Sequence, residues 1–171
     1  MTDYYAYIKP KDEDKKALIE LISSDNPIKI KDSFIKTIHN NIVHLGRHYM
    51  GRIFLWDANY KLSSEKILFP RYNPTRESIE KFLNNTSQKI TIFDDGGIDF
   101  TCKEFLRIAY NTRGLSLTDY YKKQSPNYKK DKLLLEDIAK KIPEEIKKNF
   151  SIATGEFIND GLHFSSQTDF I

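Results

Sequence analysis

Cysteine, glycine and long hydrophobic runs are all scarce in this sequence, and each shortage argues against a class of protein. The single cysteine, Cys102, excludes an internal disulfide and a zinc site that needs several thiolates. The seven glycines are scattered and form no G-x-G-x-x-G dinucleotide motif and no P-loop. A Gly-x-Ser-x-Gly nucleophile motif is missing as well. The sequence therefore gives no support to a nucleotide-dependent enzyme or a serine hydrolase.

No stretch approaches the roughly 18 consecutive apolar residues that a membrane-spanning helix needs. The first residues, Met-Thr-Asp-Tyr-Tyr, have no basic start and lead into no apolar run, so they predict no export signal. We therefore expect a cytoplasmic protein that has no contact with a membrane.

Apolar and aromatic residues are present in amounts typical of a globular domain. Of the 171 residues, 39% are hydrophobic and 13% are aromatic, with ten tyrosines and eleven phenylalanines. A chain of this length and composition buries enough apolar surface to offset its conformational entropy. It contains no internal repeat, low-complexity tract or Pro/Gly/Ser linker. We expect one globular domain over residues 1–171.

In the first half of the chain, strand-like and helix-like stretches alternate irregularly. Residues 4–8 predict a short strand, and residues 12–23 carry apolar side chains at helical spacing. Asp32 predicts the cap of a second helix, which would run through Leu45 and end at Gly46. Strand-like stretches follow at 52–56, 60–62 and 66–69.

The second half carries the clearest local signals. The β-branched run 89–93 predicts a strand, and residues 94–97 predict a turn that leads back through 98–100. Thr101 and Glu104 match a capping box at the start of a helix. Further helices are expected after Asn73–Pro74 and at 118–124, 132–141 and 143–150, with a closing hairpin over 155–164.

This order of elements lacks the strict alternation of strand and helix that parallel sheets require. It favours an α+β fold with a mixed or antiparallel sheet and several packed helices. We expect the strand at 89–93 to lie inside the sheet and the helix at 132–141 to pack on it.

His44 and His48 have the four-residue spacing of paired metal ligands on a helix. Gly46 weakens that helix, and no third ligand can be identified from the sequence. The alternative is a pair of surface or helix-end histidines. We expect no bound metal and no other cofactor. Cys102 has two readings as well, a catalytic nucleophile or a small buried hydrophobe, and the second is favoured.

Three carboxylates, Asp94, Asp95 and Asp99, gather around Gly96–Gly97. Such a cluster is able to bind Mg²⁺ or to supply a general acid and a base, as in a nuclease. Its spacing does not match an EF-hand loop, and Lys103 and Glu104 follow in the wrong order for the Glu-x-Lys motif of metal-dependent nucleases. The alternative is a polar turn with an acidic rim.

The positive charge is concentrated in one C-terminal segment. Residues 122–148 hold nine lysines and five acidic residues, a net of +4 within a chain whose net charge is +3. Tyr120, Tyr121 and Tyr128 are interleaved with these lysines, a combination that suits phosphate contact and base stacking. Lysine-rich helices also occur simply as solvated faces.

No family motif is present, and no enzyme signature stands out. We therefore expect a small protein-binding module, of which the bacterial immunity proteins that mask a cognate toxin are one class. The second reading is a nucleic-acid-binding accessory protein that uses residues 122–148, and the third is a nuclease-like enzyme built on the acidic turn. The expected partner-binding residues are Trp56, Tyr60, Asp94, Asp95 and Asp99. The alternative, which the sequence favours, is that Trp56 lies in the core and the aspartates only solubilise a turn.

Overall fold

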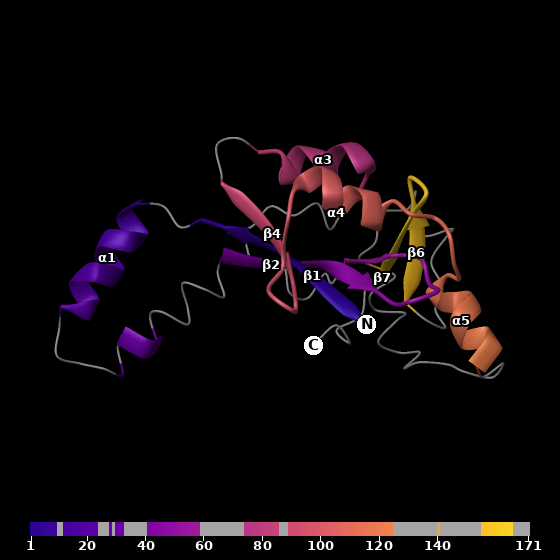
Figure 1. The fold of residues 1–171 in the computed structure, drawn as a ribbon, viewed down its shortest axis with the longest axis horizontal. Coiled ribbons are helices and arrows are strands. Elements are labelled where there is room, and N and C mark those ends of the chain that lie inside the picture. The colour runs from indigo at the N-terminus through magenta and orange to yellow at the C-terminus, as the bar shows by residue number, and fades with distance from the viewer. Residues whose placement is uncertain are drawn as a thin grey trace.

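The computed structural model describes residues 1–9, 12–23, 28, 30–32, 41–58, 74–85, 89–124, 140 and 155–165. The described strands form one seven-stranded sheet in the order β5-β4-β1-β2-β3-β7-β6 (Figure 1). Their bounds are β1 Thr2–Ile8, β2 Ile42–His48, β3 Leu55–Asp57, β4 Ile90–Asp94, β5 Asp99–Phe100, β6 Glu156–Asn159 and β7 Leu162–Ser165. The pair β3 and β7 is parallel, and the other described pairs are antiparallel. The α+β fold with a mixed sheet is thus confirmed.

Two helices, α3 (Arg76–Leu83) and α4 (Cys102–Ala109), cover one face of this sheet (Figure 1). Each begins with a capping box, in which Thr75 or Thr101 bonds the backbone three residues on. The expected start at Asn73–Pro74 is therefore displaced to Thr75, whereas the start at Thr101 is confirmed. The helix expected at 118–124 is α5 (Leu117–Gln124).

The core lies between the sheet and these two helices, and it is rich in aromatic rings. Trp56 is at its centre, with the rings of Phe54 and Phe105 at centroid distances of 5.0 and 5.6 Å in edge-to-face contact. Tyr4, Ala6 and Ile8 come from alternate positions of β1, as expected for a strand with one buried face. The other buried residues of this core cluster are Val43, Leu45, Ala58, Ile79, Phe82, Leu83, Ile92, Ala109, Phe157, Leu162 and Phe164.

The end expected at Leu45 for the second helix is wrong, because residues 42–48 form the central strand β2. Residues 33–40 of that expected helix lie outside the described residues. Apolar residues in this stretch fit helical spacing, but Val43 and Leu45 also alternate with polar residues as in a strand. β1 hydrogen-bonds to one edge of β2 and β3 to the other, and these tertiary contacts decide between the two periods. Gly46 therefore ends no helix; it lies under the ring of Phe54.

The closing hairpin is confirmed as β6 and β7, joined at Asp160–Gly161. Both turn residues have positive φ angles, 49° and 71°, as a two-residue type I′ turn requires. The Asp160 carboxylate also accepts a 2.8 Å hydrogen bond from the backbone N–H of Arg76, the first residue of α3. The turn thus places a negative charge at the N-terminus of a helix, where it is stabilising.

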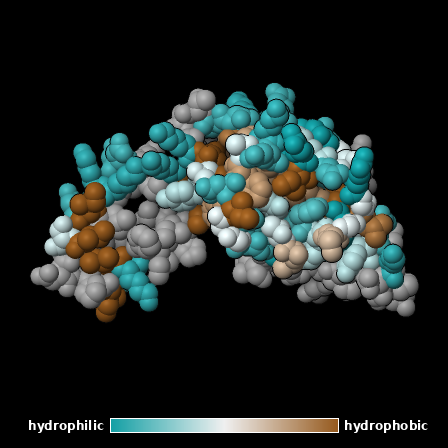
Figure 2. Space-filling view, in the orientation of Figure 1, coloured by the Kyte–Doolittle hydropathy of each residue, from teal (hydrophilic) through white to brown (hydrophobic). Residues whose placement is uncertain are grey.

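Helix α1 (Asp12–Ile22) follows β1 but stands apart from the sheet (Figure 1). Ile19 and Ile22 on this helix are 61% and 57% exposed. Figure 2 shows hydrophobic side chains on the surface at the α1 end of the molecule. The strands and helices expected at 60–62, 66–69 and 143–150 lie outside the described residues, as does the helix at 132–141 apart from Lys140. The expected position of strand 89–93 is confirmed, because β4 lies between β5 and β1.

Gly46→Ala should lower the free energy of unfolding by about 3 kcal/mol, the upper range for overpacking a core. A Cβ at this position would lie 2.4 Å from the carbonyl oxygen of Leu55 and 2.6 Å from the Phe54 ring. Gly97→Ala is the control, because its φ is +79° but its Cβ would meet nothing within 4 Å. Urea denaturation should show a loss near 1 kcal/mol for the control, from backbone strain alone. Equal losses in the two variants would contradict the close packing at Gly46.

Candidate functional site

The sheet face opposite α3 and α4 carries ionisable side chains at the positions that alternate with the core. Asp3, His44 and Asp57 come from the neighbouring strands β1, β2 and β3. Asp3 and Asp57 are buried, with 7% and 2% of their surface exposed. Burying a carboxylate is costly unless it is paired, so the partners of these groups determine what the face can do.

His44 bridges the two buried aspartates. Its Nδ1 lies 2.8 Å from Asp57 Oδ2, and its Nε2 lies 3.1 Å from Asp3 Oδ1. Each ring nitrogen therefore faces one carboxylate. The Arg47 guanidinium supplies a cation to Asp3, because its Nε and a terminal nitrogen donate to the two oxygens of Asp3 at 2.6 and 3.0 Å. The buried Asp3 carboxylate thus has both a histidine ring and a guanidinium beside it.

Glu156 is another buried acidic residue on the same face of the sheet. The strand register places it near Asp57. Asp57 pairs with Ser165 across β3 and β7, and Ser165 pairs with Glu156 across β7 and β6. His163 Nδ1 is 2.8 Å from Glu156 Oε1, and the backbone N–H of Thr118 donates to Oε2 at 2.8 Å. The Thr118 hydroxyl also donates to Oε2.

The Glu156 carboxylate anchors the start of α5 to the sheet. Burial opposes its ionisation, but the hydrogen bonds from His163 and Thr118 outweigh burial and lower the pKa of Glu156. It stays ionised at neutral pH and accepts from the first backbone N–H groups of a helix. This geometry fits a structural ion pair that fixes α5.

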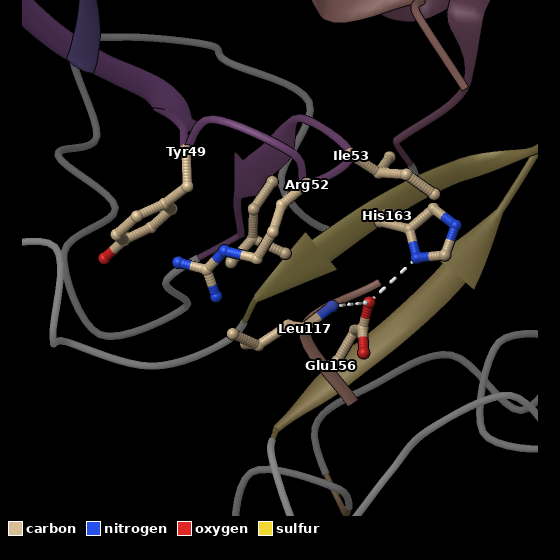
Figure 3. Close-up of a pocket in the computed structure, with 7 residues that line it drawn as sticks. Tyr49, Arg52, Ile53, Leu117, Glu156 and His163 are labelled. Carbon is tan, nitrogen blue, oxygen red and sulfur yellow. Dashed lines mark hydrogen bonds and ion pairs between the residues drawn. The ribbon is translucent and has the colours of Figure 1, made fainter. Parts of the chain in front are cut away.

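Arg52 lies in a shallow depression lined by Tyr49, Arg52, Ile53, Leu55, Leu117, Glu156 and His163 (Figure 3). Its guanidinium carbon is 3.4 Å from the centroid of the Tyr49 ring and 4.2 Å from that of Tyr120. Figure 3 shows the guanidinium directed toward Tyr49, at the opposite end of the depression from His163 and Glu156. The depression encloses no space that would hold a substrate in the way an active-site pocket does.

The three predicted aspartates in the turn between β4 and β5 have two different roles. The Asp94 carboxylate is buried and accepts hydrogen bonds from the backbone N–H groups of Gly96 and Ile98 at 3.0 and 2.8 Å. Asp94 therefore shapes the turn, and the expectation of an exposed carboxylate at this position is wrong. Asp95 and Asp99 are exposed, as predicted, on either side of Ile98.

The prediction of Trp56 as an exposed anchor is wrong, because the residue is 0% exposed within β3. Its indole Nε1 has no hydrogen-bond partner, the one such buried side-chain nitrogen or oxygen in the described part of the chain. The rings that surround Trp56 fill the core, so its role is packing. Tyr60, the second predicted anchor, lies outside the described residues.

His44 and His48 share strand β2, and His44 is occupied by the two aspartates. Burial lowers the pKa of His48, although a hydrogen bond with the backbone of Arg52 opposes that shift. Across the described ranges, no three His, Cys, Asp or Glu side chains converge in a way that would hold a metal ion. Among the described helices, none is both long and apolar enough to cross a bilayer.

Sequence reasoning missed most of the paired charges. Glu156 and Asp3 each stand in an otherwise apolar or aromatic strand, which is a signal that a buried partner exists. Nothing in the sequence pairs Asp3 with Arg47, which is 44 residues away. Glu156 and His163 are only seven residues apart in the predicted hairpin, so its register was the signal that could have paired them. Comparisons with models of protein families, with curated proteins and with solved structures found no match.

Glu156→Gln should destabilise the fold at pH 7 by about 2 kcal/mol, the scale for a hydrogen bond to a charged group. The folded pKa of Glu156 is lowered, so its contribution is complete above the ordinary value of 4.5 and is lost as the pH falls through the folded pKa. Urea unfolding at several pH values should show the difference from wild type shrinking in acid. Glu77→Gln, at an exposed site, should change little at any pH. A pH-independent difference at Glu156 would contradict its ionised state.

Cys102 should react slowly with iodoacetamide in the native protein. The residue is partly buried against the core, and burial, with a smaller effect from Glu80, raises the pKa of its thiol. Since the thiolate is the reactive form, we expect alkylation at pH 7.5 to be at least about tenfold slower than in urea. Mass spectrometry over time measures both rates, and Cys102→Ser provides the blank. Equal rates would revive the nucleophile reading.

Proposed function

We propose that this chain is a protein-binding module that recognises its partner through the turn between β4 and β5. The observation that carries the proposal is the exposed tip of this turn. Ile98 is 61% exposed and lies between the exposed carboxylates of Asp95 and Asp99. An exposed apolar side chain flanked by charge is a common arrangement in interfaces, where burial supplies affinity and charge supplies selectivity.

The turn is held in one conformation before any partner arrives. The Asp94 side chain bonds two backbone N–H groups of the turn, and the Asp94 backbone bonds Gly97 and Ile98. The backbone N–H of Asp95 also donates to the carbonyl of Asp3 at 3.0 Å, which ties the turn to β1. A preorganised loop loses little conformational entropy on binding, so more of its contact energy is retained as affinity.

The chemistry of the tip indicates a partner with a basic surface. Two carboxylates on one turn attract lysine and arginine side chains and accelerate encounter at low salt. A nucleic-acid-degrading toxin has such a surface because its substrate is anionic. We therefore propose that the module is an immunity protein that neutralises a cognate toxin in the cytoplasm by direct binding.

The nucleic-acid-binding alternative depends mainly on residues outside the described ranges. Lys123 and Lys140 of the basic segment are described and are exposed. Nucleic-acid binding through this segment would weaken steeply with salt, because each phosphate contact releases condensed counterions. The nuclease-like alternative loses support at the acidic turn, since the Asp94 carboxylate is bonded to the turn backbone.

The test begins with a search of the neighbouring genes for a toxin domain. Binding to that domain is then measured with a double substitution at the tip, Asp95→Lys with Asp99→Lys. We expect binding to weaken by more than about 1 kcal/mol, mainly through slower association, because like charges now meet. Surface plasmon resonance at two salt concentrations measures both rates, and survival of cells that express the toxin reports neutralisation.

The matched control carries the same change in net charge elsewhere, through Glu13→Lys with Glu20→Lys on the exposed side of α1. This variant should keep the wild-type association rate if position, and not total charge, determines binding. Equal loss in both variants would remove the turn from the interface. Absence of any toxin binding by the wild-type chain would overturn the proposed function.

A further inference from the structure

Arg52 is a buried cation without a counterion in the described part of the chain. The residue is 7% exposed, and none of the described carboxylates forms an ion pair with its guanidinium. By contrast, Arg47 on the same side of the sheet has both oxygens of Asp3. A buried charge without a partner is costly, so its retention calls for a compensating interaction.

The rings of Tyr49 and Tyr120 supply part of this compensation. Their centroids lie 3.4 and 4.2 Å from the guanidinium carbon, and each contact is a cation–π interaction. Such rings interact with the faces of the guanidinium plane, whereas the N–H groups point outward from its edge. None of the described residues accepts a hydrogen bond from these edge N–H groups, and none of the Arg52 nitrogens is among the fully buried ones that lack a partner.

An arginine held in this way is prepared to bind an oxyanion. The edge of a guanidinium offers parallel N–H donors that match two oxygens of one carboxylate or phosphate. The rings fix its orientation, so little side-chain entropy is lost when the ligand arrives. Glu156, which lines the same depression, is already bonded by His163 and Thr118 and does not compete for Arg52.

We propose that Arg52 binds a carboxylate side chain of a polypeptide ligand at this depression. The lining also includes the apolar residues Ile53, Leu55 and Leu117, which suits an acidic residue with hydrophobic neighbours. A nucleic-acid backbone fits less well, because the two rings that would stack bases are committed to Arg52. This site is separate from the turn at Asp95 and Asp99 and does not depend on that turn having a partner.

The experiment titrates the full ¹⁵N-labelled chain with the capped tripeptide N-acetyl-Leu-Glu-Leu-amide. The Arg52 Nε–H signal should shift and saturate, while those of the exposed Arg107 and Arg113 stay unchanged. The matched Leu-Gln-Leu peptide should bind at least about tenfold more weakly, since it lacks the charge. Inorganic phosphate and chloride at equal ionic strength are the other probes.

Three variants test the geometry. Arg52→Lys keeps the positive charge but loses the pair of parallel N–H donors, and should weaken binding of the glutamate peptide about tenfold. Tyr120→Leu should weaken it because one face of the guanidinium loses its ring, whereas Tyr120→Phe should retain it. If a variant fails to fold, the wild-type titration still decides. A selective, saturable shift at Arg52 with the glutamate peptide supports the proposal. Tighter binding of phosphate, or no saturable shift at Arg52, overturns it.

Discussion

The pairing of β1 with β2 at the centre of the sheet is the constraint on which the rest of the structure depends. Its register sets Asp3 opposite Arg47 and Tyr4 opposite Gly46, with an irregularity between Tyr4 and Tyr5. One face of this pair then belongs to the aromatic core, and the other carries the paired charges. Gly46 leaves the space on the core face that the Phe54 ring fills.

The buried charges make this register costly to change. A shift of one residue would move the side chains of Asp3 and Arg47 into the aromatic core and bring core residues to the polar face. Buried ion pairs are poor sources of net stability, because desolvation offsets much of the attraction. Their contribution in this sheet is to specificity, since misaligned pairings leave charges without partners. The asymmetry between Arg47, which is paired with Asp3, and Arg52, which has no carboxylate partner among the described residues, stands out for that reason.

Local chemistry made much of the second half of the chain predictable. The β-branched strand, the glycine turn after Asp94 and the capping box at Thr101 each depend on neighbours within a few residues, and the structure confirms all three. The Asp160–Gly161 hairpin belongs to the same class. The sequence could not distinguish β2 from a helix, because its apolar residues fit both spacings. Pairing with other strands, which no local signal reveals, decides between the two. The role of Trp56 was wrong for a related reason: an aromatic residue beside a turn fits an anchor or a core.

The parallel pairing of β3 with β7 brings Leu55 next to His163 and Trp56 next to Phe164. Contacts between residues so distant along the chain form late, because a long loop must close before they contribute. During synthesis on the ribosome, β3 therefore remains an open edge until the hairpin of β6 and β7 has emerged. An open edge beside a large apolar surface is prone to pair with other chains. The order of synthesis thus leaves the nascent protein prone to aggregation until the hairpin of β6 and β7 docks on β3.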